Sequence, residues 1–250
     1  MIDIIHHMKE FNKYVNTFDL NNPRVSLKIA HTYRVVNFAK EIAVSLNLSK
    51  EDVELAKLIA LYHDFGRFYQ VTKYNTFDDN ISLDHAQLAN DLLDEKNLLN
   101  VEKELIKTAI YHHNKKEITN VNDERTMLFS KLVRDADKLD ITNLFLIDTL
   151  RIKENAGFIS DKIYESVLNK SLIDYKDMKS DIDKYVLNIG LLFDLNFDYS
   201  IKYSKDNNTF IRLIDKIIEK NPHETEKLLK IKELVIEFLE NKTGGASYAQ

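Results

Sequence analysis

The amino-acid sequence predicts an all-α fold, because it is poor in helix breakers and its hydrophobic residues recur with helical spacing. Of its 250 residues, 5 are glycine and 2 are proline, and the chain is rich in Leu, Ile, Lys and Glu. Apolar residues return every three or four positions almost throughout. Helices joined by short polar loops are therefore expected.

The expected helices begin near residue 24. The first covers residues 24–46, and the second starts after Ser49, a suitable N-cap, and runs to His63. Gly66 is expected to terminate this second helix, and the Asn and Asp residues within 68–81 predict an irregular loop. Further helices are expected near residues 82–95, 101–113, 124–150, 159–174, 178–193, 207–220 and 223–242.

Composition excludes several classes of protein and site. The chain is 44% hydrophobic and 30% charged, as in ordinary globular proteins. It has no cysteine, so disulfides and thiolate metal sites are ruled out. Neither a signal peptide nor an apolar run long enough to cross a membrane is visible, so a cytoplasmic protein without a membrane partner is expected. The net charge of −5 argues against a broad nucleic-acid-binding face.

Three of the expected helices carry an ionisable residue on an otherwise apolar stripe. These are His31 between Leu27 and Val35, His63 after Leu55 and Ile59, and Asp137 after Phe129 and Val133. Burying such a group alone costs several kcal/mol, by order of magnitude, unless a partner or a metal ion compensates its charge. The alternative is that each histidine is a hydrogen-bonded core residue and that Asp137 pairs with Arg134 or Lys138.

A His-Asp doublet strengthens the interpretation as a metal site. His63 and Asp64 are adjacent at an expected helix end, where two consecutive side chains can reach one centre. Two imidazoles and two carboxylates suit a divalent transition metal such as Mn, Fe, Zn, Ni or Co. The sequence therefore predicts a metal held by His31, His63, Asp64 and Asp137.

These residues, with their flanks, resemble the HD superfamily of metal-dependent phosphohydrolases. The first histidine opens HTYRVV, the doublet lies in LIALYHDFGR, and the last aspartate lies in LVRDADKLD. The resemblance spans roughly residues 25–145 and implies an HD-domain helical bundle with additional C-terminal helices at about 150–242. No Ser-, Gly- or Pro-rich linker divides the chain, so a single domain over residues 1–242 is expected, followed by a flexible tail at 243–250.

Two parts of the predicted ligand set have alternatives. Within LVRDADKLD, the match favours Asp137 as the ligand. Asp140 is then expected to contact the metal ligands without binding the metal, and Asp135 is expected to face solvent. Some members of the superfamily hold a second metal, for which His85 in SLDHAQLA and His112 or His113 in AIYHHN occur in the matching order. We expect His85 and His112 to be the second-metal ligands, with Asp64 as the bridge. The alternative is that the double histidine only caps its helix.

The resemblance implies hydrolysis of a phosphomonoester or phosphodiester bond by metal-activated water, in a nucleotide or related small metabolite. Arg67 is the first candidate for binding the phosphate, and Lys28 and Lys115 are further candidates. The aromatic residues after the doublet are candidates for stacking on a nucleobase: Phe68, Tyr69, Tyr74 and Phe77.

The branches of the superfamily with defined substrates do not match. No Gly-Tyr-Pro segment follows the double histidine, and Gly66-Arg67 stand where the guanosine-tetraphosphate hydrolases carry an acidic pair. Two other functions stay open, a di-iron oxygenase on the same scaffold and a non-catalytic nucleotide-binding regulator. Homo-oligomer formation also stays open.

Overall fold

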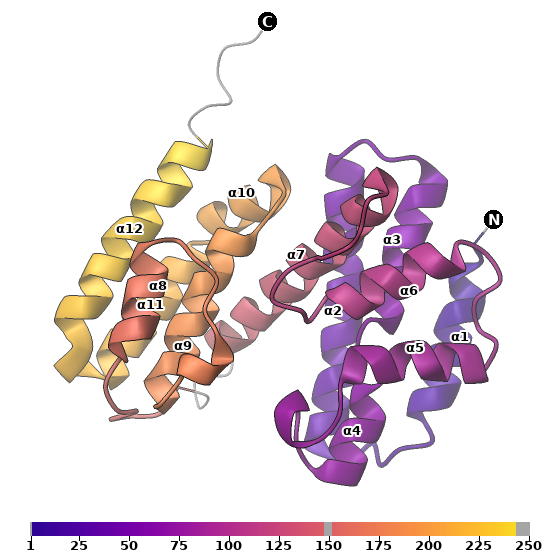
Figure 1. Cartoon of the computed structure of the whole chain (residues 1–250), viewed down its shortest axis with the longest axis horizontal. Helices are drawn as coiled ribbons and strands as arrows, with labels where there is room; N and C mark the ends of the chain where they lie inside the picture. Colours follow the sequence, from indigo (N-terminus) through magenta and orange to yellow (C-terminus); the bar gives the residue numbers. More distant parts are fainter. Residues whose placement is uncertain (1, 148–151, 244–250) are drawn as a thin grey trace, which may run out of the picture. The chain divides into compact units, whose positions relative to one another are not determined.

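The computed structural model describes residues 2–147 and 152–243. Every regular element within these residues is a helix, and none of them lies in a strand (Figure 1). The predicted all-α fold is therefore confirmed. Contacts divide the chain after Asp137 into two compact units, described here one at a time. The single domain over residues 1–242 stays a prediction.

The first unit holds six helices and the start of a seventh. They are α1 (Ile4–Val15), α2 (Pro23–Ser45), α3 (Lys50–Tyr62), α4 (Arg67–Tyr74), α5 (His85–Glu95), α6 (Lys103–His112) and, up to Asp137, α7 (Glu124–Ile147). A short 3-10 helix, η1 (Asp79–Ile81), connects α4 to α5. Helices α2 and α3 pack along one another, and α3 also contacts α1 and α6. This places α3, and the doublet at its end, at the centre of the unit.

Helix starts follow the predicted chemistry. Ser49 caps α3 by accepting a hydrogen bond from the Asp52 amide at 3.1 Å, as predicted. Asn22 caps α2, and Pro23 occupies its first turn, where a missing amide proton costs nothing. The predicted role of Gly66 is wrong, because α3 already ends at Tyr62 and Gly66 precedes α4.

Two helices of the first unit were not predicted. Helix α1 lies before the first expected element, and α4 occupies the first half of the expected loop at 68–81. Phe68 and Val71, three residues apart, are fully buried on one face of α4, and this packing outweighs the local turn preference. The turn begins only at Asn75, which adopts a left-handed conformation with φ of 51° and ends the helix.

An aromatic cluster forms the core beneath the doublet. Tyr14 packs against Phe65 with ring centroids 4.0 Å apart, and Phe68 lies 5.7 Å from Phe11 and 6.0 Å from Phe18. Aromatic pairs at these separations add to the free energy gained by burying their area. The unpredicted helix α1 thus supports the segment that carries His63 and Asp64.

The second unit is also helical in its described part. It contains the remainder of α7, then α8 (Asp161–Leu168), α9 (Asp181–Gly190), α10 (Asp198–Asp206), α11 (Thr209–Lys220) and α12 (Thr225–Thr243), with 3-10 turns between some of them. Helix α12 packs against α8, α10 and α11, and α9 contacts α8 and α11. Helix α10 was not predicted, and it buries only Ile201, Ser200 and Ser204.

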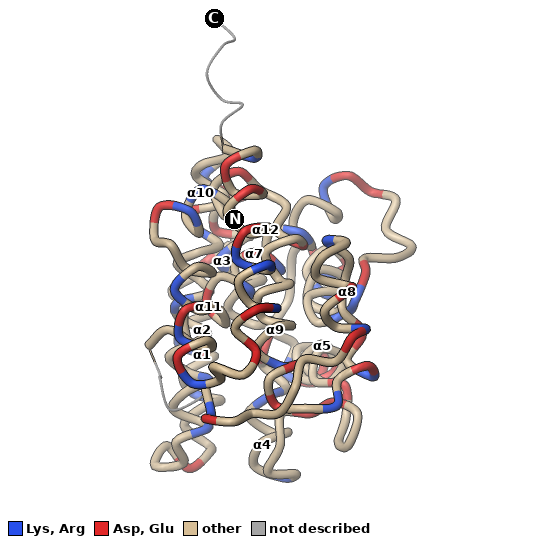
Figure 2. Tube along the Cα trace, turned by 90° about the vertical axis from the view of Figure 1, so that its left-hand side faces the viewer, with Lys and Arg blue, Asp and Glu red and all other residues tan. Residues whose placement is uncertain are grey.

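Charge and hydropathy agree with the composition. Basic and acidic residues are interspersed along the chain in Figure 2. Among the described residues, no helix combines the length and the apolar character that a membrane crossing requires.

Replacing Phe68 with alanine tests the aromatic core. We expect Phe68→Ala to lower the free energy of unfolding by about 3–5 kcal/mol, because the side chain is fully buried and its loss leaves a cavity. Tyr74→Ala, on the same helix but 41% exposed, should change it by less than about 0.5 kcal/mol. Urea unfolding followed by circular dichroism measures both, and equal losses would show that Phe68 is not part of the core.

Candidate metal centre

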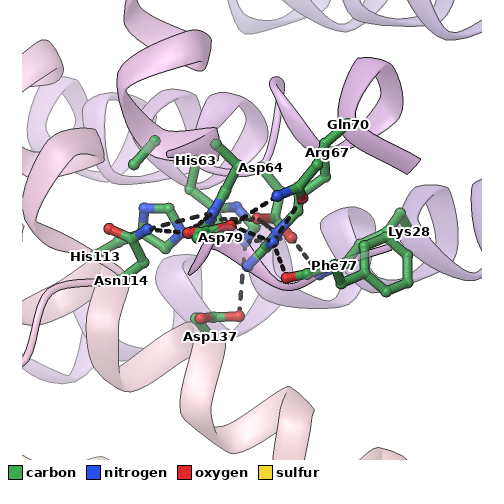
Figure 3. Close-up of polar contacts among 12 residues, drawn as sticks. Lys28, His63, Asp64, Arg67, Gln70, Phe77, Asp79, His113, Asn114 and Asp137 are labelled. Atoms are coloured by element: carbon green, nitrogen blue, oxygen red, sulfur yellow. Dashed lines mark hydrogen bonds and ion pairs between the residues drawn. The ribbon is translucent and has the colours of Figure 1, made fainter. Parts of the chain in front are cut away.

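Three helices of the first unit bring the predicted ligands together. His31 lies in the middle of α2, His63 follows the last residue of α3, and Asp137 lies on α7. Packing of α2 along α3 turns His31 towards the doublet, and both imidazoles are buried. Figure 3 shows Asp137 on a separate helix, opposite His63 and Asp64. The apolar stripes on which His31 and His63 lie therefore meet.

The first cluster consists of four atoms, one from each predicted ligand. His31 Nε2 lies 3.1 Å from Asp137 Oδ1, 3.4 Å from Asp64 Oδ2 and 3.3 Å from His63 Nε2. His63 Nε2 lies 3.5 Å from Asp64 Oδ2 and 3.6 Å from Asp137 Oδ1. Ligands bound at about 2.0–2.2 Å to one ion in tetrahedral or octahedral geometry are themselves about 3.0–3.6 Å apart. The spacing of the His31, His63 and Asp64 atoms fits a divalent metal, and Asp137 Oδ1 contacts both imidazoles of this group.

The electrostatics of the cluster also call for a cation. Burial favours the neutral form of Asp64, but Lys28 and His63 hold the pKa of this carboxyl well below its usual range. Asp137 is likewise buried, and His31 and His63 keep its pKa well below the ordinary value. Burial opposes protonation of His63, yet Asp64 and Asp137 raise its pKa to about 10. A divalent metal would supply the positive charge that a proton otherwise brings.

A second cluster shares Asp64 with the first. Asp64 Oδ1 lies 3.3 Å from His85 Nε2 and 3.7 Å from His113 Nε2, and these two nitrogens are 3.0 Å apart. The carboxylate therefore presents one oxygen to each cluster. Burial lowers the pKa of His113 to about 4, which leaves its imidazole neutral, the form that binds metals. This cluster matches the order of residues expected for a second metal.

His63 and His113 are held in the same way. Each follows the last residue of its helix and donates Nδ1–H to the carbonyl three residues earlier: Ala60 at 2.7 Å and Ile110 at 2.6 Å. A carbonyl only accepts, so Nδ1 of each ring carries a proton and Nε2 is the nitrogen that faces the cluster. Helices α3 and α6, which contact each other, thus present equivalent ligands at their ends.

The expected preference for His112 over His113 is wrong. His112 lies outside both clusters among the described residues, its ring packs against Tyr111 and its carbonyl accepts a hydrogen bond from Arg134. Consecutive helical residues point about 100° apart, so only one of the pair can face α3. The sequence pattern identified the pair but not which member faces inward.

Gly66 brings α5 close to the doublet. A Cβ at this position would lie 2.3 Å from the carbonyl oxygen of His85 and 3.1 Å from the Ala89 amide. No larger residue fits there without moving one of the two segments. The glycine therefore permits the approach that places His85 beside Asp64, rather than ending α3 as predicted.

The other two aspartates of LVRDADKLD are buried. Asp135 is completely buried, so its predicted exposure to solvent is wrong. Helix α7 buries residues on more than one face here, including Leu132, Val133, Ala136 and Leu139. Asp140 is also buried and lies beyond the boundary of the first unit, so its supporting role stays a prediction. Only Asp137 of the three joins the metal-ligand groups.

The three basic candidates differ in what they contact. Lys28 Nζ lies 2.5 Å from Asp64 Oδ2, beside the first cluster. Arg67 Nη1 donates to the Gln70 side chain, the Phe77 carbonyl and Asp79. Lys115 pairs with Asp84 and lies over the Tyr111 ring. Lys28 is therefore the basic group closest to Asp64, while Arg67, whose Nε lies 3.5 Å from Asp64 Oδ1, also orders the segment after α4.

The aromatic candidates separate in the same way. Phe68 belongs to the buried core and is not available for stacking. Tyr69 and Tyr74 are partly exposed and lie near Lys73. Phe77 lies with its ring centroid 5.4 Å from Lys28 Nζ, so of the four candidates it is the one that contacts a basic residue of the site (Figure 3).

Several polar residues around the second cluster were not predicted. Asp79 contacts the His85 imidazole and accepts a hydrogen bond from Asn114. Gln70 donates to Ser82 in the loop between α4 and α5. Asp79 lies among several turn-forming residues, so its position in the sequence indicated no role at the site. Asn114 follows His113 as Asp64 follows His63, and this parallel was the only signal in the sequence.

One comparison with known proteins identifies a family over the segment that carries the site. Residues 29–142 match the family model described as HD domain, and this range includes every ligand of both clusters. No curated protein and no solved structure matches the chain.

Neighbouring alanine variants test the second cluster. His113→Ala should lower the metal content by about one ion per chain, because it removes one of the three ligands of the second cluster. His112→Ala should leave the content unchanged, because its side chain points elsewhere. Elemental analysis of both proteins, prepared without chelator and loaded with Mn²⁺, measures the difference. Loss of metal in His112→Ala and not in His113→Ala would show that His112 is the ligand.

Proposed function

We propose that the chain, whose residues 29–142 match the HD domain, is a metal-dependent phosphohydrolase with two metals bridged by Asp64. The proposal places one ion among His31, His63, Asp64 and Asp137, and the second beside His85 and His113. The substrate is a phosphomonoester or phosphodiester, in a nucleotide or related small phosphorylated metabolite.

The shared carboxylate is the observation that carries this proposal. Asp64 is 3% exposed and has imidazole nitrogens within 3.3–3.7 Å of both its oxygens. A buried carboxylate with histidines on both sides is typical of a bridging ligand, and two ions held in this way lie about 3.5–4 Å apart. Such a pair, when bound, supplies an acidified water and neutralises charge on the phosphoryl group.

The remaining groups bind and orient the substrate. Lys28, at the edge of the first cluster, is 15% exposed and can turn its ammonium towards a phosphoryl oxygen once the charge of Asp64 is neutralised. Arg67 holds the loop that borders the second cluster, and its Nε lies 3.5 Å from Asp64 Oδ1. Phe77 offers an apolar surface beside Lys28, which favours a substrate with both a phosphate and a flat ring.

A substrate screen with a matched variant tests this function. The Mn²⁺-loaded protein should release phosphate or nucleotide from at least one member of a panel of phosphomonoesters, nucleotides and cyclic nucleotides. Asp64→Asn should abolish that activity, because the amide cannot bridge two cations, while the helix content measured by circular dichroism stays unchanged. Undiminished turnover in the variant would contradict the proposed mechanism.

Lys28→Met tests the binding of phosphate. It keeps a long side chain but removes the charge, so kcat/KM should fall by about 10²–10³-fold, the usual cost of losing one partner of the transition-state charge. Lys40→Met on the same helix, where the side chain is half-exposed, should leave kcat/KM within about twofold. Steady-state kinetics on the same substrate measures both, and equal effects would remove Lys28 from the site.

The bridged pair of clusters also fits a di-iron oxygenase, which is the second candidate. Histidine and carboxylate ligands around two ions suit iron as well as manganese. Iron content together with substrate-dependent oxygen consumption would favour the oxygenase, whereas release of phosphate without oxygen uptake favours the phosphohydrolase.

A further inference from the structure

We propose that Asp79 positions the second metal site by fixing the tautomer and orientation of His85. The inference rests on the proposed two-metal function and extends it to a residue outside the ligand set. Asp79 lies on η1, in the loop between α4 and α5, and His85 is the first residue of α5. Its role differs from that of a ligand, because its Oδ2 contacts His85 Nδ1, whereas the nitrogen of His85 that faces Asp64 is Nε2.

The contact between the two side chains is short and specific. His85 Nδ1 lies 2.6 Å from Asp79 Oδ2, while His85 Nε2 faces Asp64 and His113. An ionised carboxylate only accepts hydrogen bonds, so Nδ1 must carry the proton. The lone pair is then on Nε2, the atom that the second metal requires. Metal-binding histidines commonly depend on such a carboxylate partner.

Asp79 is itself held firmly from both sides. Its Oδ1 accepts hydrogen bonds from Arg67 Nη1 and Gln70 Nε2, both at 2.8 Å. Its Oδ2 accepts from Asn114 Nδ2 at 2.9 Å as well as from His85. Four donors therefore surround one carboxylate, as the lines in Figure 3 show in part. Asn114 directly follows His113, so Asp79 links the segments that carry both histidines of the second cluster.

The buried side-chain amide of Gln70 holds this loop in place through hydrogen bonds. Gln70 Nε2 also donates to Ser82 Oγ at 2.8 Å and to the Leu83 carbonyl at 3.1 Å, and its Oε1 accepts from Arg67. The loop is thereby fixed at both ends around Asp79. A loop with no role at the site would not need a fully buried amide and a guanidinium to hold one carboxylate.

An asparagine at position 79 cannot satisfy this environment. If its amide NH₂ faces Arg67 and Gln70, it can accept neither of the hydrogen bonds that these two side chains donate to Asp79. If the NH₂ faces His85, then Nδ1 must accept the hydrogen bond, the proton moves to Nε2, and that nitrogen can no longer bind a metal. Asp79→Asn should therefore weaken the second metal site and spare the first, although it changes only one atom of the side chain.

The matched control is Asp78→Asn on the same loop. The Asp78 side chain accepts hydrogen bonds only within the turn, from the amide and side chain of Asn80 at 2.9 and 3.0 Å. Asparagine is as good as aspartate at such a helix N-cap, so the turn should survive. Both variants remove one negative charge from the same loop, and only Asp79→Asn alters the partner of His85.

Metal titration of the full chain distinguishes the outcomes. With Mn²⁺ followed by isothermal titration calorimetry, we expect two sites in the wild type and in Asp78→Asn. Asp79→Asn should weaken the second site by about 10–100-fold and leave the first within about twofold. Equal affinities in Asp79→Asn and the wild type, or equal weakening in both variants, would overturn the proposal.

The tautomer of His85 gives a second readout that needs no variant. Nitrogen-15 NMR of the Zn²⁺-loaded wild type should show a proton on Nδ1 of His85. A proton on Nε2 would overturn the proposal even if Asp79→Asn fails to fold.

Two bound ions without hydrolysis of any phosphoester would refute the proposed function and leave the role of Asp79 standing. A wild type without a second metal would refute both.

Discussion

The first unit depends on one constraint, the burial of the Asp64 carboxylate between two pairs of imidazoles. An ionised carboxylate in the interior is costly unless cations or strong donors surround it. Here Lys28 and the histidines of four segments supply that environment. Helix α2 contributes Lys28 and His31, while α5 and the ends of α3 and α6 contribute one histidine each, so the packing of these helices determines the chemistry of the site. A pair of divalent metals would complete it.

Helix ends and close contacts provide the necessary precision. His63 and His113 follow the last residues of α3 and α6, where free carbonyls fix the orientation of each ring. Gly66 lets α5 approach until His85 reaches Asp64. The aromatic cluster of α1 and α4 packs against Phe65, the residue directly after Asp64. The ligands therefore lie on rigid elements, with a loop placed only at their outer side.

Much of this site could be predicted because the ligands lie on regular elements. His31 and His63 interrupt apolar stripes, and the adjacent Asp64 made the pair conspicuous. The choice between His112 and His113 could not be predicted, because it depends on a rotation of about 100° at a helix end that local periodicity does not fix. Helix α4 was missed because burial of Phe68 and Val71 overrides the turn preference of the residues that follow. Asp79 was missed because its partners come from 6 to 35 positions away in the sequence.

The central claim is that Asp64 bridges two metal ions, and anomalous X-ray diffraction from crystals grown with Mn²⁺ tests it most directly. The account predicts two anomalous peaks about 3.5–4 Å apart. One should lie within about 2.0–2.3 Å of a nitrogen or oxygen of His31, His63, Asp64 and Asp137, and the other should contact Asp64, His85 and His113. A single peak that Asp64 does not contact, or no peak with the six side chains paired only to one another, would contradict it.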